Sequence, residues 1–105
     1  MIDFLVELKD MDGASIQAPR ADGEKPAPAT LKMAAVNALI QPFPDEKLDG
    51  AKKLDRGILA ERIHLAKEPL DLTSEEVTLV KSVVGKMYPP LIVLRAWRLL
   101  DPAVK

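Results

Sequence analysis

Several residue types that carry chemistry are scarce in this sequence. Cysteine is absent, histidine occurs once, and aromatic residues make up 4% of the 105 residues. Without cysteine there is no disulfide framework and no thiolate, which is compatible with a reducing compartment. The single histidine, His64, has no second histidine or cysteine with which to bind a transition metal. We therefore expect no disulfide, no metal ion and no cofactor.

Long hydrophobic runs are missing as well. No uninterrupted apolar stretch approaches the ~20 residues that a membrane span requires. The opening residues, MIDFLVELKD, place Asp3 and Glu7 where a secretory signal has a basic start and a longer apolar run. We expect a cytoplasmic protein with no membrane contact.

Motifs of catalysis are lacking too. The stretch Asp10–Gly13 (DMDG) resembles the start of a calcium loop, but Ala21 stands where such a loop needs its last acidic ligand. The five glycines are too scattered to build a phosphate-binding loop, and no Gly-x-Ser-x-Gly motif occurs. We expect neither an enzymatic activity nor a small-molecule substrate.

The composition that is present is that of a folded protein. Hydrophobic residues make up 48% and charged residues 30%, and 105 residues suffice for one domain spanning residues 1–105. The net charge of −1 is unevenly spread: residues 1–50 hold five basic and nine acidic residues, and residues 51–105 hold ten and seven. This division is typical of solvated charge scattered over helix surfaces; the alternatives are an acidic partner for the second half, or copies that meet head to tail.

The N-terminal residues have the pattern of a β-hairpin. Apolar residues alternate along the first stretch at Ile2, Phe4, Val6 and Leu8, which is the period of a half-buried strand. Asp12-Gly13 is a strong turn signal, and ASIQA can pair back as a second strand. We predict a hairpin over residues 1–18, followed by a proline-rich loop over residues 19–29.

The remaining residues, 30–105, read as about four helices. Thr30 can cap a largely buried helix that begins at Leu31 and ends by Pro42. A second helix is predicted from about Asp45 to Ala66 with one broad apolar face, whose members are Leu48, Ala51, Leu54, Ile58, Leu59, Ile63 and Ala66. Asp55 and Arg62 fall in the same sector, so we predict a structural polar pair, bonded to each other or to backbone groups; a local kink is the alternative.

The last two helices have clear boundaries. Thr73 and Glu76 have the spacing of a capping box, which predicts a helix start at this point. Tyr88-Pro89-Pro90 ends that helix and begins the final one. The predicted fold is therefore α+β and mainly α, with an N-terminal β-hairpin followed by about four helices in one compact domain.

The final helix is apolar on almost every side, and only Arg95 and Arg98 interrupt it. Two such helices are hard to bury together in a chain of this length, so a partner or a second copy is expected to cover this one. The candidate partner-binding residues are Leu91, Leu94, Arg95, Trp97 and Arg98. In the alternative, the hairpin covers the helix and the monomer is complete.

A nucleic-acid-binding or regulatory protein is the second function class. In this interpretation the helix pair joined at Tyr88–Pro90 is a helix-turn-helix, and Arg95, Trp97 and Arg98 reach DNA or RNA. Against it, a recognition helix needs a wide polar face, and the chain as a whole is acidic.

The order of these features resembles a known group of proteins. The DMDG hairpin, TLKMAAVNALI, KKLDRGILAERIHLA and above all LTSEEVTLVKSVVGKMYPPLIVLRAWRLLD look like small proteins encoded by tailed bacteriophages and prophages. The resemblance implies a role in virion assembly or host takeover. The expected function is therefore a non-enzymatic protein–protein interaction module. It would bind itself or another phage protein in the host bacterial cytoplasm or the virion.

Overall fold

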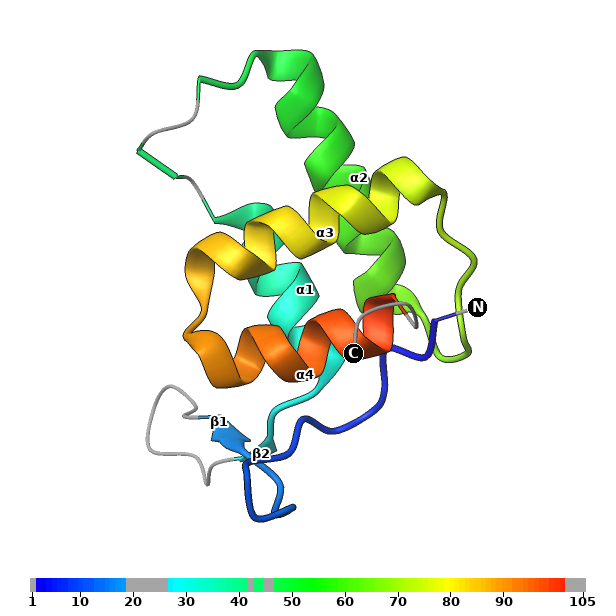
Figure 1. Cartoon of the computed structure of the whole chain (residues 1–105). Helices are drawn as coiled ribbons and strands as arrows, with labels where there is room; N and C mark the ends of the chain where they lie inside the picture. Colours follow the sequence, from blue (N-terminus) through cyan, green and yellow to red (C-terminus); the bar gives the residue numbers. More distant parts are fainter. Residues whose placement is uncertain (1, 19–26, 42, 45–46, 102–105) are drawn as a thin grey trace.

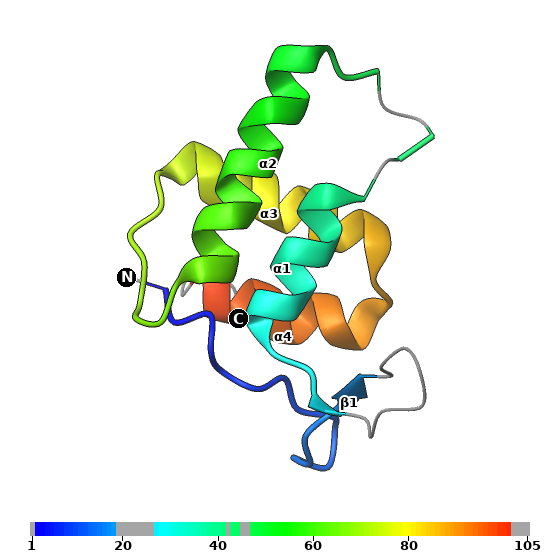
Figure 2. The ribbon, with the colours of Figure 1, turned by 180° about the vertical axis from the view of Figure 1, so that it is seen from behind.

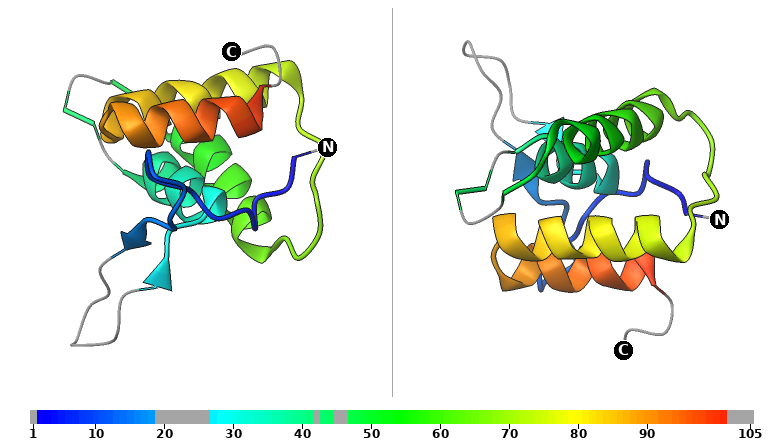
Figure 3. Two further views of the ribbon diagram at one scale, coloured as in Figure 1. Left: turned by 60° about the horizontal axis from the view of Figure 1, so that its bottom comes forward. Right: turned by 90° about the horizontal axis from the view of Figure 1, so that it is seen from above.

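Four helices account for most of the chain that the computed structural model describes, which is residues 2–18, 27–41, 43–44 and 47–101. In chain order the helices are α1 (Leu31–Ile40), α2 (Gly50–Leu65), α3 (Ser74–Met87) and α4 (Pro90–Leu100). Two strands of two residues each, β1 (Gln17–Ala18) and β2 (Ala27–Pro28), pair antiparallel. The helices form two layers, α1 with α2 and α3 with α4 (Figure 1 and Figure 3).

The N-terminal residues do not form the predicted β-hairpin. Residues 2–16 contain no strand. In place of strands, their backbone makes isolated bridges, which pair Ile2 with Leu70, Glu7 with Thr30 and Lys9 with Ser15. The prediction of an α+β fold with a hairpin over residues 1–18 is therefore wrong, and the described part of the chain is mainly helical. Of the predicted proline-rich loop, residues 19–26 lie outside the described residues.

The alternating pattern has a different physical cause, which is burial of one side of an extended segment. Phe4 and Leu8 are each 1% exposed and pack against the helices. The backbone of this segment, the N-terminal strap (residues 2–16), bonds to the start of α1. The N–H groups of Leu31 and Lys32, which have no partner within a helix, donate to the carbonyl oxygens of Val6 and Phe4 at 3.0 and 2.7 Å. The strap thus satisfies the first turn of α1, while across its own turn the N–H groups of Ile16 and Asp10 donate to the carbonyl oxygens of Leu8 and Ala14.

A turn closes the far end of the strap. Gly13 has a φ of 87°, a conformation that side chains disfavour, and its N–H donates to the carbonyl oxygen of Asp10 at 3.1 Å. The Asp10 carboxylate accepts the N–H groups of Asp12 at 2.8 Å and Ala14 at 3.0 Å. The turn signal in the sequence was thus correct, although the strands around it are absent from the described residues.

Helix α1 is the central element, because it packs against each of the other helices. The Thr30 hydroxyl accepts the N–H of Met33 at 3.2 Å, as the cap prediction requires. Half of its residues are buried, and most of these are alanines: Leu31, Ala34, Ala35, Ala38 and Leu39. Small side chains let neighbouring helices approach closely. The prediction of a largely buried helix is confirmed.

Helices α3 and α4 form an antiparallel pair that lies side by side in Figure 3. The capping box is present: the Thr73 hydroxyl accepts the N–H of Glu76 at 3.1 Å, and the Glu76 carboxylate accepts the N–H of Thr73 at 2.9 Å. Pro90 is the first residue of α4, as predicted. A Cβ added at Gly85 would lie 3.4 Å from the Trp97 ring, so the glycine allows the two helices to pack closely there.

Helix α2 differs from its prediction in both start and orientation. It begins at Gly50, because the Asp49 carboxylate caps it by accepting the N–H of Lys52 at 2.8 Å; the predicted residues Asp45 and Glu46 lie outside the described residues. The first half of α2 projects beyond the other helices (Figure 2). Its buried residues are Arg56, Leu59, Ala60 and Ile63. The predicted apolar face is therefore divided between the two sides of the helix.

Candidate functional site

The predicted partner-binding residues of α4 lie in different surroundings. Leu94 and Trp97 line an apolar groove at the junction of α3 and α4, together with Gly85, Tyr88, Pro90 and Val93. Leu91 is half-buried, and Arg98 is exposed. The buried residues of α4 are Ala96 and Leu100. The helix is thus largely covered by the rest of the chain, and the groove is the part of it that stays open.

Arg95 is engaged inside the molecule. Its Nε donates to the carbonyl oxygen of Lys9 at 3.0 Å, and its Nη2 donates to the carbonyl oxygen of Asp10 at 2.9 Å. These bonds fasten the turn of the N-terminal strap to α4. Because the two partners are separated by 85 residues or more in sequence, no local pattern could have predicted them. The nucleic-acid interpretation requires Arg95 and Arg98 both to reach outward. Arg95 instead binds the backbone of the strap, so the two arginines differ in role.

The walls of the α3–α4 groove are held in place by polar contacts. The indole N–H of Trp97 donates to the carbonyl oxygen of Lys81 at 3.0 Å, and the Lys81 ammonium lies 4.9 Å from the centre of the Trp97 ring. The same ammonium pairs with Asp101 at 3.1 Å. Burial raises the pKa of the Tyr88 hydroxyl, and a hydrogen bond with Asn37 offsets part of this effect. Tyr88 therefore stays neutral around pH 7.

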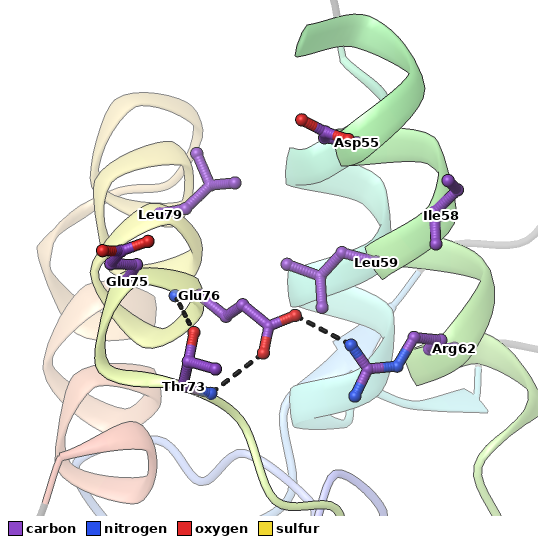
Figure 4. Close-up of a pocket in the computed structure, with 8 residues that line it drawn as sticks. All are labelled: Asp55, Ile58, Leu59, Arg62, Thr73, Glu75, Glu76 and Leu79. Atoms are coloured by element: carbon purple, nitrogen blue, oxygen red, sulfur yellow. Dashed lines mark hydrogen bonds and ion pairs between the residues drawn. The ribbon is translucent and has the colours of Figure 1, made fainter. Parts of the chain in front are cut away.

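A second cavity of about 330 Å³ lies between α2 and the start of α3 (Figure 4). It is lined by Asp55, Ile58, Leu59, Arg62, Thr73, Glu75, Glu76 and Leu79. Within it, Nη1 of Arg62 lies 2.8 Å from Oε2 of Glu76. The backbone hydrogen bond from Thr73 holds the pKa of Glu76 below its ordinary value, and Arg62 acts in the same direction. Glu76 therefore joins the cap of α3 to α2.

The predicted pair of Asp55 and Arg62 is not formed. Arg62 points toward Glu76, whereas Asp55 lies nearer to the N-terminal end of α2 (Figure 4). The Asp55 side chain is exposed, and Arg62 donates to Glu76 instead. The sequence placed both residues in one sector correctly, but the partner of Arg62 comes from another helix.

The outer side of α2 carries a set of large apolar residues, two of which, Leu54 and Ile58, the sequence analysis placed on the predicted apolar face. Leu54 is 63% exposed, Ile58 50% and Leu65 66%. They lie opposite the buried face of Leu59 and Ile63. With Ala51 and Glu61 they occupy positions 51, 54, 58, 61 and 65, which alternate by three and four residues. This is the spacing of residues along a helix–helix contact. It was the one feature of the sequence from which a contact surface on this side of α2 could have been predicted.

We name this set the α2 outer face (Ala51, Leu54, Ile58, Glu61 and Leu65). Large aliphatic side chains on a helix are usually buried, and a row of them in solvent marks a contact surface. The described residues contain no group of three or more His, Cys, Asp or Glu side chains that could hold a metal ion. The polar atoms of Thr73 and Glu76 in the neighbouring cavity are used in the cap of α3. Among the described residues, the α2 outer face is therefore the strongest candidate site.

One structural finding concerns membranes, and three comparisons with known proteins concern identity. Within the described residues, no helix combines the length and the apolar character that crossing a membrane would take. No protein-family model, no curated protein and no solved structure matches the chain. The resemblance to phage proteins and the function that it implies stay predictions.

Proposed function

We propose that the protein is a non-enzymatic protein–protein interaction module, and that the α2 outer face is its main contact surface. The observation that carries the proposal is the exposure of Leu54, Ile58 and Leu65 on a helix whose opposite side is buried in the core. We therefore propose the contact surface on α2 and not on the whole of α4, where it was expected from the sequence. The α3–α4 groove beside Leu94 and Trp97 is the second candidate contact surface.

The size of the exposed row sets the strength of the contact. The three exposed fractions amount to nearly two whole aliphatic side chains. At about 2 kcal/mol for each side chain fully buried, covering them contributes about 3–4 kcal/mol from this surface. Association costs about 4–15 kcal/mol in lost translational and rotational freedom. The partner must therefore bring an apolar surface of similar size, and the resulting contact is weak to moderate.

The partner's shape follows from the row itself. Five positions spaced by three and four residues on a straight helix form a narrow ridge, which fits the matching ridge of another helix. We propose on the resemblance alone that the setting is phage or prophage assembly, where such a module would join protein subunits.

Photo-crosslinking in cells tests the proposed function. A photoreactive amino acid replaces Ile58 on the outer face, and a matched variant carries it at Ser82, which is exposed on α3. We expect one discrete protein adduct from position 58 and none from position 82. Mass spectrometry then identifies the adduct as a second copy or as another protein. Absence of any adduct at position 58, in a variant that folds, would contradict the proposal.

A further inference from the structure

The identity of the partner follows from charges that flank the α2 outer face, if that face is the contact surface proposed above. Asp55 and Arg62 have opposite charges and lie seven residues, or about two helical turns, apart. Both lie on the same edge of the row, the edge toward α3, since both line the cavity between α2 and α3. The other edge has Gly57 and His64 in the corresponding positions.

The arrangement of these charges distinguishes the two ways in which two copies of α2 can pair. In a parallel pair, each such edge faces the opposite edge of the partner, so Asp55 and Arg62 would meet Gly50 and Gly57, which carry no charge. In an antiparallel pair, an edge faces the same edge of the partner. Asp55 of each copy then meets Arg62 of the other, and two complementary contacts form around one two-fold axis.

The antiparallel register also matches the apolar positions. When Asp55 faces the partner's Arg62, Leu54 faces the partner's Leu65, and Ile58 faces the partner's Glu61. The aliphatic residues at the two ends therefore pack on each other. At Gly57 an added Cβ would meet no atom within 4 Å, so the backbone there is open to close approach.

We infer that a second copy of this chain occupies the α2 outer face, with the two α2 helices antiparallel. Such a contact uses the same surface on both copies and closes after two subunits. Arg62 can take part without losing its bond to Glu76, because that bond uses Nη1 and a guanidinium has five N–H donors. Its side chain is 45% exposed, so it is accessible to the partner.

Glu61 limits the strength of the contact. It interrupts the apolar row near the two-fold axis, where its carboxylate must lie against the partner's Ile58 and close to the partner's own Glu61. Burying a carboxylate without a partner is unfavourable. The dimer should therefore be weak and should dissociate on dilution. Glu61→Leu should raise its association constant by at least about tenfold, because one aliphatic side chain replaces the charge.

Disulfide crosslinking tests the orientation, because the chain contains no cysteine of its own. Purified Leu54→Cys and Leu65→Cys proteins are oxidised separately and as a mixture. The antiparallel pair predicts a crosslinked dimer in the mixture and little in either protein alone. A Ser82→Cys protein mixed with either variant controls for random collision. Crosslinking of Leu54→Cys with itself would overturn the antiparallel orientation.

Charge reversal tests the two polar contacts by sedimentation equilibrium. Asp55→Arg and Arg62→Asp each place like charges together in the dimer, so each should weaken self-association by about tenfold. An equimolar mixture of the two variants should recover the association, because every contact is again between opposite charges. Failure of the mixture to recover it would overturn the inference.

The oligomeric state and the crosslinking at position 58 together separate self-association from binding to another protein. A wild-type protein that stays monomeric at millimolar concentration, yet gives a discrete adduct with another protein from position 58, overturns the self-association and supports the proposed function. A monomeric protein that gives no adduct from that position overturns both.

Discussion

Removing the side chain of Arg95 should destabilise the protein far more than removing that of Arg98. Arg95 is half-buried and donates two hydrogen bonds, at 3.0 and 2.9 Å, to the carbonyl oxygens of Lys9 and Asp10. Arg98 lies one turn away on α4 and is exposed. The pair of variants Arg95→Ala and Arg98→Ala thus removes the same type of side chain from the same helix in two environments.

The magnitude follows from the two bonds. A hydrogen bond that involves a charged group contributes about 1.5–3 kcal/mol. Because one side chain makes both bonds and its loss lets water reach the carbonyl groups, we expect Arg95→Ala to lower the free energy of unfolding by about 2–3 kcal/mol. Arg98→Ala should stay within about 0.5 kcal/mol of the wild type, as exposed substitutions do.

Urea unfolding followed by circular dichroism measures the difference. With a denaturant dependence of about 1.5 kcal/mol per molar, Arg95→Ala should lower the unfolding midpoint by about 1.5 M. Hydrogen exchange should also accelerate at Gly13, in the turn that Arg95 fastens. Equal midpoints for the two alanine variants would refute the stabilising role of the bonds from Arg95 to the strap. Arg95 would then be a surface residue, as expected from the sequence.

Three further predictions concern the two sides of α2, the cap of α3 and the hydroxyl of Tyr88. Ile58→Ser should leave the thermal melt nearly unchanged, whereas Ile63→Ser, on the buried side of α2, should lower the free energy of unfolding by at least about 2 kcal/mol; equal losses would contradict the two-sided helix. Thr73→Ala should cost about 1 kcal/mol by removing half of the capping box, measured by urea unfolding, and an unchanged midpoint would contradict it. Tyr88 is the single tyrosine, so absorbance titration reports its pKa alone. Because burial raises that pKa in the folded state, the folded protein should lose its tyrosine proton at higher pH than the urea-unfolded protein, and its stability should fall as pH rises above about 10.

The features that could be predicted from the sequence depend on neighbouring residues. The Thr30 cap, the Thr73–Glu76 capping box and the proline start of α4 each involve atoms within a few residues of one another. Short-range geometry determines such features, so residue type and spacing suffice to recognise them. The turn at Gly13 belongs to the same class, since its bonds lie within residues 10–14.

The features that were missed depend on contacts across the chain. The alternation of Ile2, Phe4 and Leu8 is compatible with a hairpin strand and with a strap on helices, and only the position of α1 decides between them. Likewise, Ile58 and Ile63 both lie on α2 and have similar side chains, but Ile58 is half exposed and Ile63 is buried in the main hydrophobic core. Periodicity indicates which residues share a face, yet the neighbouring helices determine which face is buried.

Methyl NMR spectra of the wild-type protein across a concentration series test whether two copies meet through α2. We expect the methyl signals of Leu54, Ile58 and Leu65 to shift with concentration as the α2 outer face becomes covered, while those of the buried Ile63 and Val83 stay in place. Signals that do not move at any concentration, or shifts confined to Leu94 in the α3–α4 groove, would contradict the claim that two copies meet through α2.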